Sequence, residues 1–205
     1  MDWNQWLQQR QAASKMEATP IGLAEIRGWE TTSESVQRPD EAFFKVGGMN
    51  IAPTAQREVS SWDQPAIYEK GEGAIMLLRN LYNESFLIQA KAEPGNDSLG
   101  CVLLAPTLQA SMSNLQAAHG GKKPPRAELI TEEVKWTSLC QDGGRYYHKK
   151  NRYAIVVVDN EELQLTENER WFSIEELSEA VLQGCANEHL AQAYALYMAH
   201  ACVAY

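Results

Sequence analysis

The sequence predicts a single α+β domain, and three observations lead to that class. At least six short apolar runs have the length of β-strands, most of them are joined by short turns, and helices are indicated at both ends of the chain. A chain of 205 residues is long enough for one sizeable core, and no internal repeat divides it.

The first thirty residues are expected to be helical and to pack on the rest of the domain. Residues 2–16 place Trp3 and Trp6 on one face of a helix, with glutamine and arginine at most other positions. Residues 21–29 predict a second, shorter helix. We expect the two tryptophans to dock residues 1–30 on the core, because large aromatic side chains bury much apolar area.

Turn residues separate the predicted strands. Gly47 and Gly48 indicate a turn or a bulge, and Asn83 lies in a hairpin turn between two apolar runs. The valine-rich run near residue 156 is the clearest strand signal in the chain. The predicted strands are residues 42–46, 49–51, 73–81, 85–90, 100–104 and 153–158.

Three segments have a helical pattern and one is undecided. A helical spacing of apolar residues predicts helix or helical turns within residues 107–118. Ser173 and Glu176 have the spacing of a capping box at the start of a helix, and a final helix is expected from Asn187 onward. Residues 128–136 fit a strand or a helix equally well.

Composition and charge exclude several classes of protein. The net charge of −9 argues against nucleic acid or an anionic membrane surface as the main partner. No apolar run approaches the roughly 20 residues of a transmembrane helix, and the acidic, polar start of the chain predicts no signal peptide. Four scattered cysteines without CxxC spacing are expected to be reduced thiols in a cytoplasmic protein.

The motifs predict neither a metal nor a redox cofactor. The chain has no GxGxxG loop and no P-loop, so a bound nicotinamide is not indicated. The four histidines lie far apart and lack helical pairing to carboxylates, so no metal-ligand cluster is expected.

Residues 88–121 carry the polar motifs around which the chain is organised. Residues 89–96 read Gln-Ala-Lys-Ala-Glu-Pro-Gly-Asn, residues 106–114 read Pro-Thr-Leu-Gln-Ala-Ser-Met-Ser-Asn, and residues 119–121 read His-Gly-Gly. Polar groups gathered beside strand ends are typical of a site for a polar small molecule. These motifs, in this order and spacing, resemble the signature of the NDP-hexose 2,3-dehydratases, which act in deoxysugar biosynthesis.

The resemblance extends more weakly over most of the chain and implies a fold and a reaction. The implied fold is Nudix-like, with a mixed β-sheet flanked by helices, in one domain over residues 1–205. The Nudix catalytic box is absent, so metal-dependent pyrophosphate hydrolysis is disfavoured. Family members are usually about twice this length because the domain is duplicated, and this chain carries one copy.

The implied substrate is a dTDP-linked 4-keto-6-deoxyglucose. Its 4-keto group acidifies the C3 proton, a base removes that proton, donors hold the enolate oxygen, and the hydroxyl leaves C2. The resulting enol tautomerises to a 3,4-diketo sugar, so the chemistry needs acid–base groups but no redox cofactor. An NAD(P)H-dependent 3-ketoreductase would act downstream.

The candidate site residues come from these motifs. Lys91, Glu93 and His119 are the candidate catalytic acid–base groups, although a lone lysine or glutamate in a turn is usually only solvated. The candidate substrate-binding residues from the same stretch share neutral hydrogen-bonding side chains and are Gln89, Asn96, Thr107, Gln109, Ser113 and Asn114.

The resemblance adds four candidate residues for the nucleotide or the pyrophosphate. Trp62 and Gln64 belong to a Trp-x-Gln-Pro element, in which the tryptophan would stack on a base or sugar; a buried tryptophan before a strand end fits equally well. Asn151 and Arg152 match an Arg/Lys-Asn-Arg run, and the alternative there is a solvated run of charges.

One segment departs from the family pattern. Where the family tends to read Val-Asn-Met-Asp-x-Arg, this chain reads Ala186-Asn-Glu-His-Leu-Ala191. The asparagine is kept and the arginine is not, which puts any role of that arginine in doubt here.

Two main hypotheses for function follow, with a third in reserve. The first is a 2,3-dehydratase that acts as a homodimer, and the second is a catalytically silent nucleotide-sugar-binding partner or regulatory domain. The third is a related dehydratase or isomerase acting on another NDP-4-keto sugar. The dimer is expected because the tryptophan-bearing N-terminal helix and residues 195–205 are apolar for chain ends; both ends folding back on their own core is the alternative.

Overall fold

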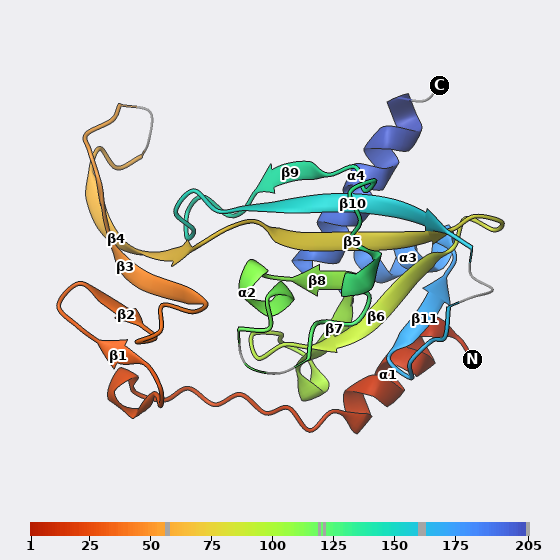
Figure 1. Cartoon of the computed structure of the whole chain (residues 1–205), viewed down its shortest axis with the longest axis horizontal. Helices are drawn as coiled ribbons and strands as arrows, with labels where there is room; N and C mark the ends of the chain where they lie inside the picture. The colour runs from red at the N-terminus through yellow and green to blue at the C-terminus, as the bar shows by residue number, and fades with distance from the viewer. Residues whose placement is uncertain (56–57, 119, 121, 160–162, 204–205) are drawn as a thin grey trace.

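The computed structural model describes residues 1–55, 58–118, 120, 122–159 and 163–203, and their strands form two sheets (Figure 1). The strands are β1 (Glu30–Thr31), β2 (Ser35–Gln37), β3 (Phe44–Ile51), β4 (Trp62–Glu69), β5 (Gly73–Asn80), β6 (Phe86–Ala92), β7 (Val102–Pro106), β8 (Leu108–Ala110), β9 (Thr137–Cys140), β10 (Lys150–Val158) and β11 (Glu169–Phe172). Strands β1 to β4 form an antiparallel sheet in chain order.

The larger sheet is mixed. Its main path is β11-β6-β5-β10-β9, with β7 paired to β6 and β8 paired to β5. The pairing between β5 and β10 is parallel over its whole length, from Gly73↔Asn151 to Asn80↔Val158, and the other pairings are antiparallel. Both central strands are strongly apolar, as expected of strands that are covered on both faces.

Helices flank the larger sheet, and three of them cover one of its faces. They are α1 (Trp3–Ala13), α2 (Met112–Leu115), α3 (Ile174–Leu182) and α4 (Glu188–Val203), with short 3-10 turns η1 (Leu23–Glu25), η2 (Leu99–Cys101) and η3 (Ala127–Leu129). Helices α1, α3 and α4 share one core cluster with the strands, whereas side chains from the loop around Leu129 and Trp136 cover the second cluster. The result is a mixed sheet flanked by helices, which confirms the α+β class.

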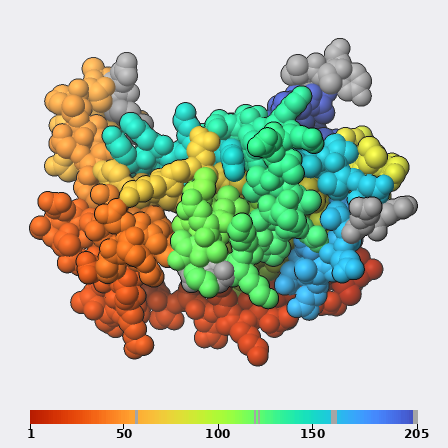
Figure 2. Space-filling view, viewed as in Figure 1, coloured from red at the N-terminus to blue at the C-terminus, as the bar shows by residue number. Residues whose placement is uncertain are grey.

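The smaller sheet, here called the arm, projects from one end of the body. Figures 1 and 2 show strands β1 to β4 as a separate lobe, whose last strand leads directly into β5. The arm is tied to the body where Ile67 exchanges backbone hydrogen bonds with Arg145 and Tyr147, at 2.8 Å and 2.9 Å. The end of β4 is therefore held beside the loop that precedes β10.

Several predicted elements are confirmed. Helix α1 begins after its cap Asp2 and buries Trp3 and Trp6 against Phe172 of β11, at ring-centroid distances of 6.3 Å and 5.9 Å. The capping box of Ser173 and Glu176 is present at the start of α3.

Other predictions were wrong in a way that tertiary pairing explains. Within residues 107–118 only Met112–Leu115 is α-helical, because Leu108–Ala110 instead forms β8 and pairs with β5. Leu108 and Ala110 alternate into the second core cluster, so the apolar positions that suggested a helix serve a strand.

Two other predicted segments also differ. Residues 21–29 contain only the 3-10 turn Leu23–Glu25, and residues 128–136 form neither a strand nor a regular helix. The two short strands expected around Gly48 are one continuous strand, β3, in which Gly48 pairs with Pro65 of β4. Strands β9 and β11 were not foreseen.

Candidate active site

A polar cavity of about 190 Å³ lies where the arm meets the larger sheet. It collects side chains from β4, β5, β6, β8, β10 and α4, together with the loops beside them. Its lining is Glu69, Ile75, Lys91, Glu93, Gln109, Ala110, Ser111, Asn114, Gln141, Tyr146, Lys149, Asn151 and His189. We call this space the sheet-end cavity. A concave, polar space with convergent titratable groups is typical of a small-molecule site.

A hydrogen-bonded cluster of four side chains belongs to this cavity. Lys91 and Glu93, two residues apart, form an ion pair with Nζ 3.1 Å from Oε1. Gln109 Nε2 donates to the same carboxylate at 2.9 Å, and its backbone oxygen accepts from Lys91 Nζ at 3.2 Å. Asn187 Nδ2 donates to Glu93 Oε2 at 3.2 Å and to Gln109 Oε1 at 2.7 Å. Glu93 thus receives bonds from three side chains, which hold its carboxylate in one place.

Asn187 joins this cluster because of its position before α4. Its side-chain Oδ1 accepts from the backbone N–H of Leu190 at 3.0 Å, which caps the helix. Its backbone N–H donates to Leu104 of β7 at 2.8 Å. The residue therefore links the helix start, the sheet and the carboxylate of Glu93 through one side chain and one peptide group.

A second ion pair borders the cavity on the arm side. Lys149 Nζ lies 3.2 Å from Glu69 Oε1 and donates to the backbone oxygen of Gly71 at 2.9 Å. The Lys149 side chain is only 3% exposed. Beside it, Asn151 Oδ1 accepts from the backbone N–H of Gly73 at 3.0 Å, so β5 and β10 are joined at the cavity edge.

His189 also lines the cavity, although it lies outside the predicted site residues. Its Nδ1 lies 3.0 Å from the hydroxyl oxygen of Tyr153. Burial lowers the pKa of His189, with a partial counter-effect from the charge of Glu188. Burial also raises the pKa of Tyr153 to about 12. The sequence offered one signal that could have pointed to His189. Residues 186–191, which include Asn187 and His189, are the segment that departs from the family pattern.

The structure brings five of the predicted site residues to the cavity. They are Lys91, Glu93, Gln109, Asn114 and Asn151. Ser113 lies one residue from Asn114 and bonds Ser111 at 2.9 Å. The predicted acid–base residue His119 lies outside the described residues.

The side chains of three other predicted residues form hydrogen bonds with backbone groups of other residues. Thr107, which is buried, accepts from the N–H of Leu78 at 3.0 Å and donates to the oxygen of Leu87. Gln89 donates to the oxygens of Pro106 and Thr107, at 2.6 Å and 3.2 Å. Asn96 donates to the oxygen of Cys101 at 2.9 Å. These side chains fix the strand ends that carry the cavity and do not line it.

Of the four residues predicted for the nucleotide or the pyrophosphate, only Asn151 lines the sheet-end cavity. Trp62 donates to Gln64 at 2.7 Å, and both lie at the start of β4, roughly 20 Å along the strand from its other end. Arg152 stacks on Trp136 with its Cζ 4.5 Å from the ring centroid. Because successive residues of β10 point to opposite faces, Arg152 faces away from the side on which Asn151 lines the cavity.

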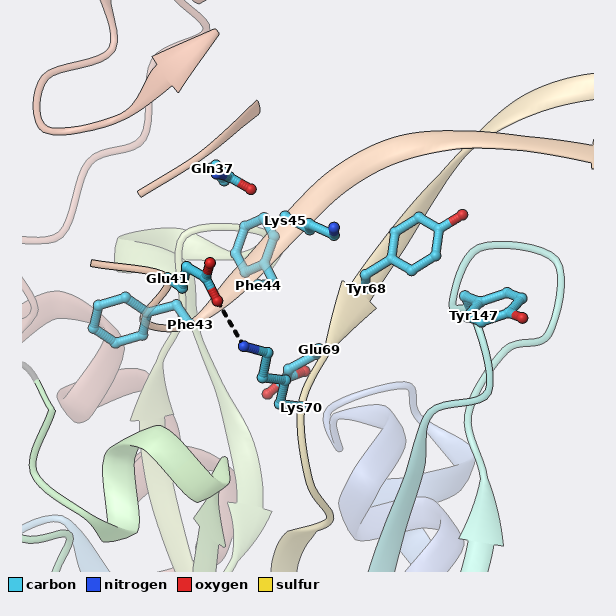
Figure 3. Close-up of a pocket in the computed structure, with 9 residues that line it drawn as sticks. All are labelled: Gln37, Glu41, Phe43, Phe44, Lys45, Tyr68, Glu69, Lys70 and Tyr147. Atoms are coloured by element: carbon cyan, nitrogen blue, oxygen red, sulfur yellow. Dashed lines mark hydrogen bonds and ion pairs between the residues drawn. The ribbon is translucent and has the colours of Figure 1, made fainter. Parts of the chain in front are cut away.

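A second, more apolar pocket of about 320 Å³ lies on the arm (Figure 3). Aromatic side chains and lysines surround it, and its lining is Gln37, Glu41, Phe43, Phe44, Lys45, Tyr68, Glu69, Lys70 and Tyr147. We call it the arm pocket. The rings of Tyr68 and Tyr147 are 5.0 Å apart, and Lys45 Nζ lies 5.6 Å from the Tyr68 ring centroid. Lys70 pairs with Glu41 at 2.8 Å. Glu69 lines both spaces, so the arm pocket and the sheet-end cavity are neighbours.

The described residues contain neither a metal-ligand cluster nor a membrane-spanning helix. No group of three or more His, Cys, Asp or Glu side chains there is placed to hold a metal ion. None of the helices found in those ranges has both the length and the apolar composition needed to cross a membrane. The four cysteines are free thiols.

The fold and the site together define an α+β domain with a polar cavity lined by titratable side chains. The chain belongs to the NDP-hexose 2,3-dehydratase family, whose model matches residues 1–188. This confirms the family that the three motifs of residues 89–121 predicted.

Two relatives show how far the similarity extends. A dTDP-4-dehydro-6-deoxy-alpha-D-glucopyranose 2,3-dehydratase of Streptomyces violaceoruber is 28% identical over 184 residues, covering 85% of this chain and 40% of the relative. The protein of the same name from Saccharopolyspora spinosa is 29% identical over 182 residues, covering 85% of this chain and 37% of the relative. The chain therefore spans about two fifths of the length of these relatives.

Among solved structures, the crystal structure of an ADP compounds hydrolase is similar with a TM-score of 0.47 and 10% identity. The match covers 90% of this chain and 95% of the other. A likeness of this size carries no information about function.

Proposed function

We propose that the sheet-end cavity is the sugar site of a nucleotide-sugar 2,3-dehydratase, a hydro-lyase of deoxysugar biosynthesis. It would remove water across C2–C3 of a dTDP-linked 4-keto-6-deoxyhexose. The observation that carries the proposal is the cluster of Lys91, Glu93, Gln109 and Asn187, because residues from two separate family motifs meet in it around one cavity. The family membership and the substrate in the relatives' names support the choice of reaction.

The cluster has the groups that such an elimination requires. Removing the C3 proton places negative charge on the oxygen at C4, and a fixed ammonium such as that of Lys91 stabilises a developing oxyanion. Glu93 fixes this ammonium at 3.1 Å and, with Lys91, is a candidate for acid–base work. Gln109 and Asn187 hold the carboxylate, so the charges are in place before the substrate arrives. The proposed reaction uses neither a metal nor a redox cofactor.

The arm pocket is the proposed place of the nucleotide. The faces of Tyr68 and Tyr147 suit a flat base, and Lys45 and Lys70 supply positive charge for a diphosphate (Figure 3). Because Glu69 lines both spaces, a ligand that spans them would place its sugar in the sheet-end cavity and its base on the arm. Glu69 would place a negative charge between the two spaces, where the diphosphate would pass. The ammonium of Lys149, which is paired with Glu69, offsets that charge.

A coupled assay tests this function. Purified protein is incubated with dTDP-4-keto-6-deoxyglucose and an NAD(P)H-dependent 3-ketoreductase, which traps the unstable 3,4-diketo product. We expect a 2-deoxy sugar nucleotide that is absent when the protein is omitted. Such a reductase is also the proposed downstream partner, since the product carries a 3-keto group.

The second candidate is a nucleotide-sugar-binding domain without turnover, acting as a partner or regulator. The observation that favours it is that the chain spans only 40% of the length of a relative named as the enzyme. The same assay separates the two, because binding of dTDP-4-keto-6-deoxyglucose without any 2-deoxy product would favour the silent domain.

A homodimer and a cytoplasmic location remain part of the proposal. The four free thiols fit a reducing compartment. The tryptophans of α1 give no support to a dimer, because they are covered by the core of their own chain. Of the two apolar chain ends on which the expected dimer rests, α4 has the exposed Met198 near its end. Light scattering at micromolar concentration tests the dimer, and an active particle of 23.0 kDa would overturn it.

A further inference from the structure

His189 occupies the sheet-end cavity with one ring nitrogen bonded and the other free. Its Nδ1 contacts the hydroxyl of Tyr153 at 3.0 Å. For Nε2, by contrast, the described part of the chain offers no hydrogen-bond partner, although the ring lines a cavity of about 190 Å³. A polar atom in this position is available to a ligand.

The surrounding hydrogen bonds determine which ring nitrogen carries the proton. Gln192 Nε2 donates to Glu188 at 2.9 Å, so Gln192 turns its oxygen toward Tyr153. An amide oxygen only accepts, and Tyr153 therefore gives its single proton to Gln192. The hydroxyl oxygen of Tyr153 must then accept from His189, which places the imidazole proton on Nδ1. The neutral ring consequently presents the unprotonated Nε2 to the cavity.

The charges around His189 come from several elements. Glu188 precedes it on α4, Lys91 and Glu93 come from β6 and its end, and Lys149 comes from the loop just before β10. Their effects on the ring oppose one another, and burial is the largest influence, lowering the pKa of His189. A lowered pKa favours the neutral ring, which is able to accept a proton, as a general base must.

We propose that His189 is a catalytic proton-transfer residue of this site, with Tyr153 and Gln192 as its positioning residues. The inference rests on the proposed function. Nε2 takes the C3 proton of the 4-keto sugar, and the electrons of that C–H bond pass into an enolate whose oxygen faces Lys91. As the C2–O bond breaks, these electrons form the C2=C3 double bond and the C4 carbonyl returns. The departing hydroxide takes the proton from the imidazolium and leaves as water, which regenerates neutral His189.

The proposed role of His189 comes from the structure of this chain and not from the family motifs. His189 lies outside the motifs of residues 89–121 that carry the family resemblance, so the resemblance did not supply it. The motif histidine, His119, belongs to a different segment. A purely structural role, in which His189 only supports the buried hydroxyl of Tyr153, is the competing explanation.

The experiment uses the full chain with dTDP-4-keto-6-deoxyglucose in D₂O. It follows deuterium exchange at C3 and formation of the 2-deoxy product with the 3-ketoreductase. For His189→Gln we expect both rates to fall about 10²- to 10⁴-fold, the usual contribution of a general base, with dTDP affinity almost unchanged. The matched control is His200→Gln, because His200 is exposed on the same helix, and it should keep the wild-type rate.

A readout that a structural role would not produce completes the test. His189→Ala should regain part of its exchange rate when imidazole is added, since free imidazole replaces the missing base. Wild-type kcat/KM should fall on the acid side as His189 becomes protonated, and this limb should be lost in His189→Gln. Circular dichroism of each variant checks the fold, and His189→Asn is the second variant if glutamine does not fold.

Two results would overturn the proposal, and they are distinguishable. If the wild type exchanges C3 but His189→Gln and His189→Asn exchange at the same rate, then the base lies elsewhere and the proposed function stands. If the wild type neither exchanges C3 nor forms a 2-deoxy product, then the proposed function fails and the role of His189 fails with it.

Discussion

Asn187 is expected to stabilise the fold and the site at once, and the two contributions can be separated. Its Oδ1 caps α4 by accepting from Leu190 at 3.0 Å, while its Nδ2 bonds Glu93 and Gln109 at 3.2 Å and 2.7 Å. Alanine removes all three bonds. Serine keeps a good cap, because its hydroxyl accepts from the same N–H, but it is too short to reach Glu93 and Gln109.

The magnitudes follow from these bonds. A lost N-cap costs about 1 kcal/mol. A lost hydrogen bond costs about 1 kcal/mol when neutral and about 1.5 to 3 kcal/mol when one partner is charged. Water entering the adjoining cavity recovers part of this, so we expect Asn187→Ala to lower the free energy of unfolding by about 3 kcal/mol and Asn187→Ser by about 2 kcal/mol.

Urea unfolding followed by tryptophan fluorescence measures both values. The slope against urea should stay constant, which shows that the variants unfold from the same compact state. The matched control is Asn50→Ala on the arm, which removes an exposed bond to Asp63 and should change stability by less than about 0.5 kcal/mol. Equal losses for serine and alanine would refute the cap, and a serine variant as stable as the wild type would refute the cluster's contribution.

Three further outcomes are expected. Lys91→Ala should lower turnover by orders of magnitude in the coupled assay while leaving dTDP affinity almost unchanged, and wild-type C3 exchange would contradict its role. Tyr68→Ala should raise the dissociation constant for dTDP about tenfold by calorimetry, because a stacked ring contributes on the order of 1 kcal/mol, whereas the exposed Tyr82→Ala should not change it. Burial tends to raise the pKa of Glu169, but the bonds from Arg126 and Thr166 together outweigh it and leave that pKa lowered, so stability from these bonds should be present above about pH 4.5 and be lost as pH falls further. Arg126→Ala should cost about 3 kcal/mol in urea unfolding at pH 7, and a loss of less than 1 kcal/mol would refute the importance of this buried pair.

Local sequence predicted the parts of the site that depend on short spacing. Lys91 and Glu93 meet because they are two residues apart at the end of one strand, and their contact needs little beyond that strand. The box of Ser173 and Glu176 is equally local, because the spacing of the two residues matches one helical turn. The family motif likewise lies within one short stretch and could be recognised without a structure.

The local sequence pattern gave a wrong prediction where long-range strand pairing favoured a different structure. The apolar spacing of residues 107–118 fits a helix, yet Leu108–Ala110 became an edge partner of β5 because strand pairing buries the same side chains and satisfies the backbone. The direction of Arg152 is similar. Its residue type suggested an anion site, but the register of β10 turned it onto Trp136 on the other face.

The sequence by itself determined the α+β class and the family, and it selected Lys91 and Glu93 as site candidates; their ion pair came from the structure. Only the tertiary structure placed Asn187 against Glu93, 94 residues away, and His189 in the same cavity. The physical reason is that sequence spacing predicts only contacts within one helical turn or one strand. The start of α4 lies beside β6 because the helix and the sheet pack together in the core, and no local spacing encodes that contact. Burial in the folded chain lowers the pKa of His189, and its Nδ1 contacts Tyr153 of another strand; the residues beside His189 encode neither effect.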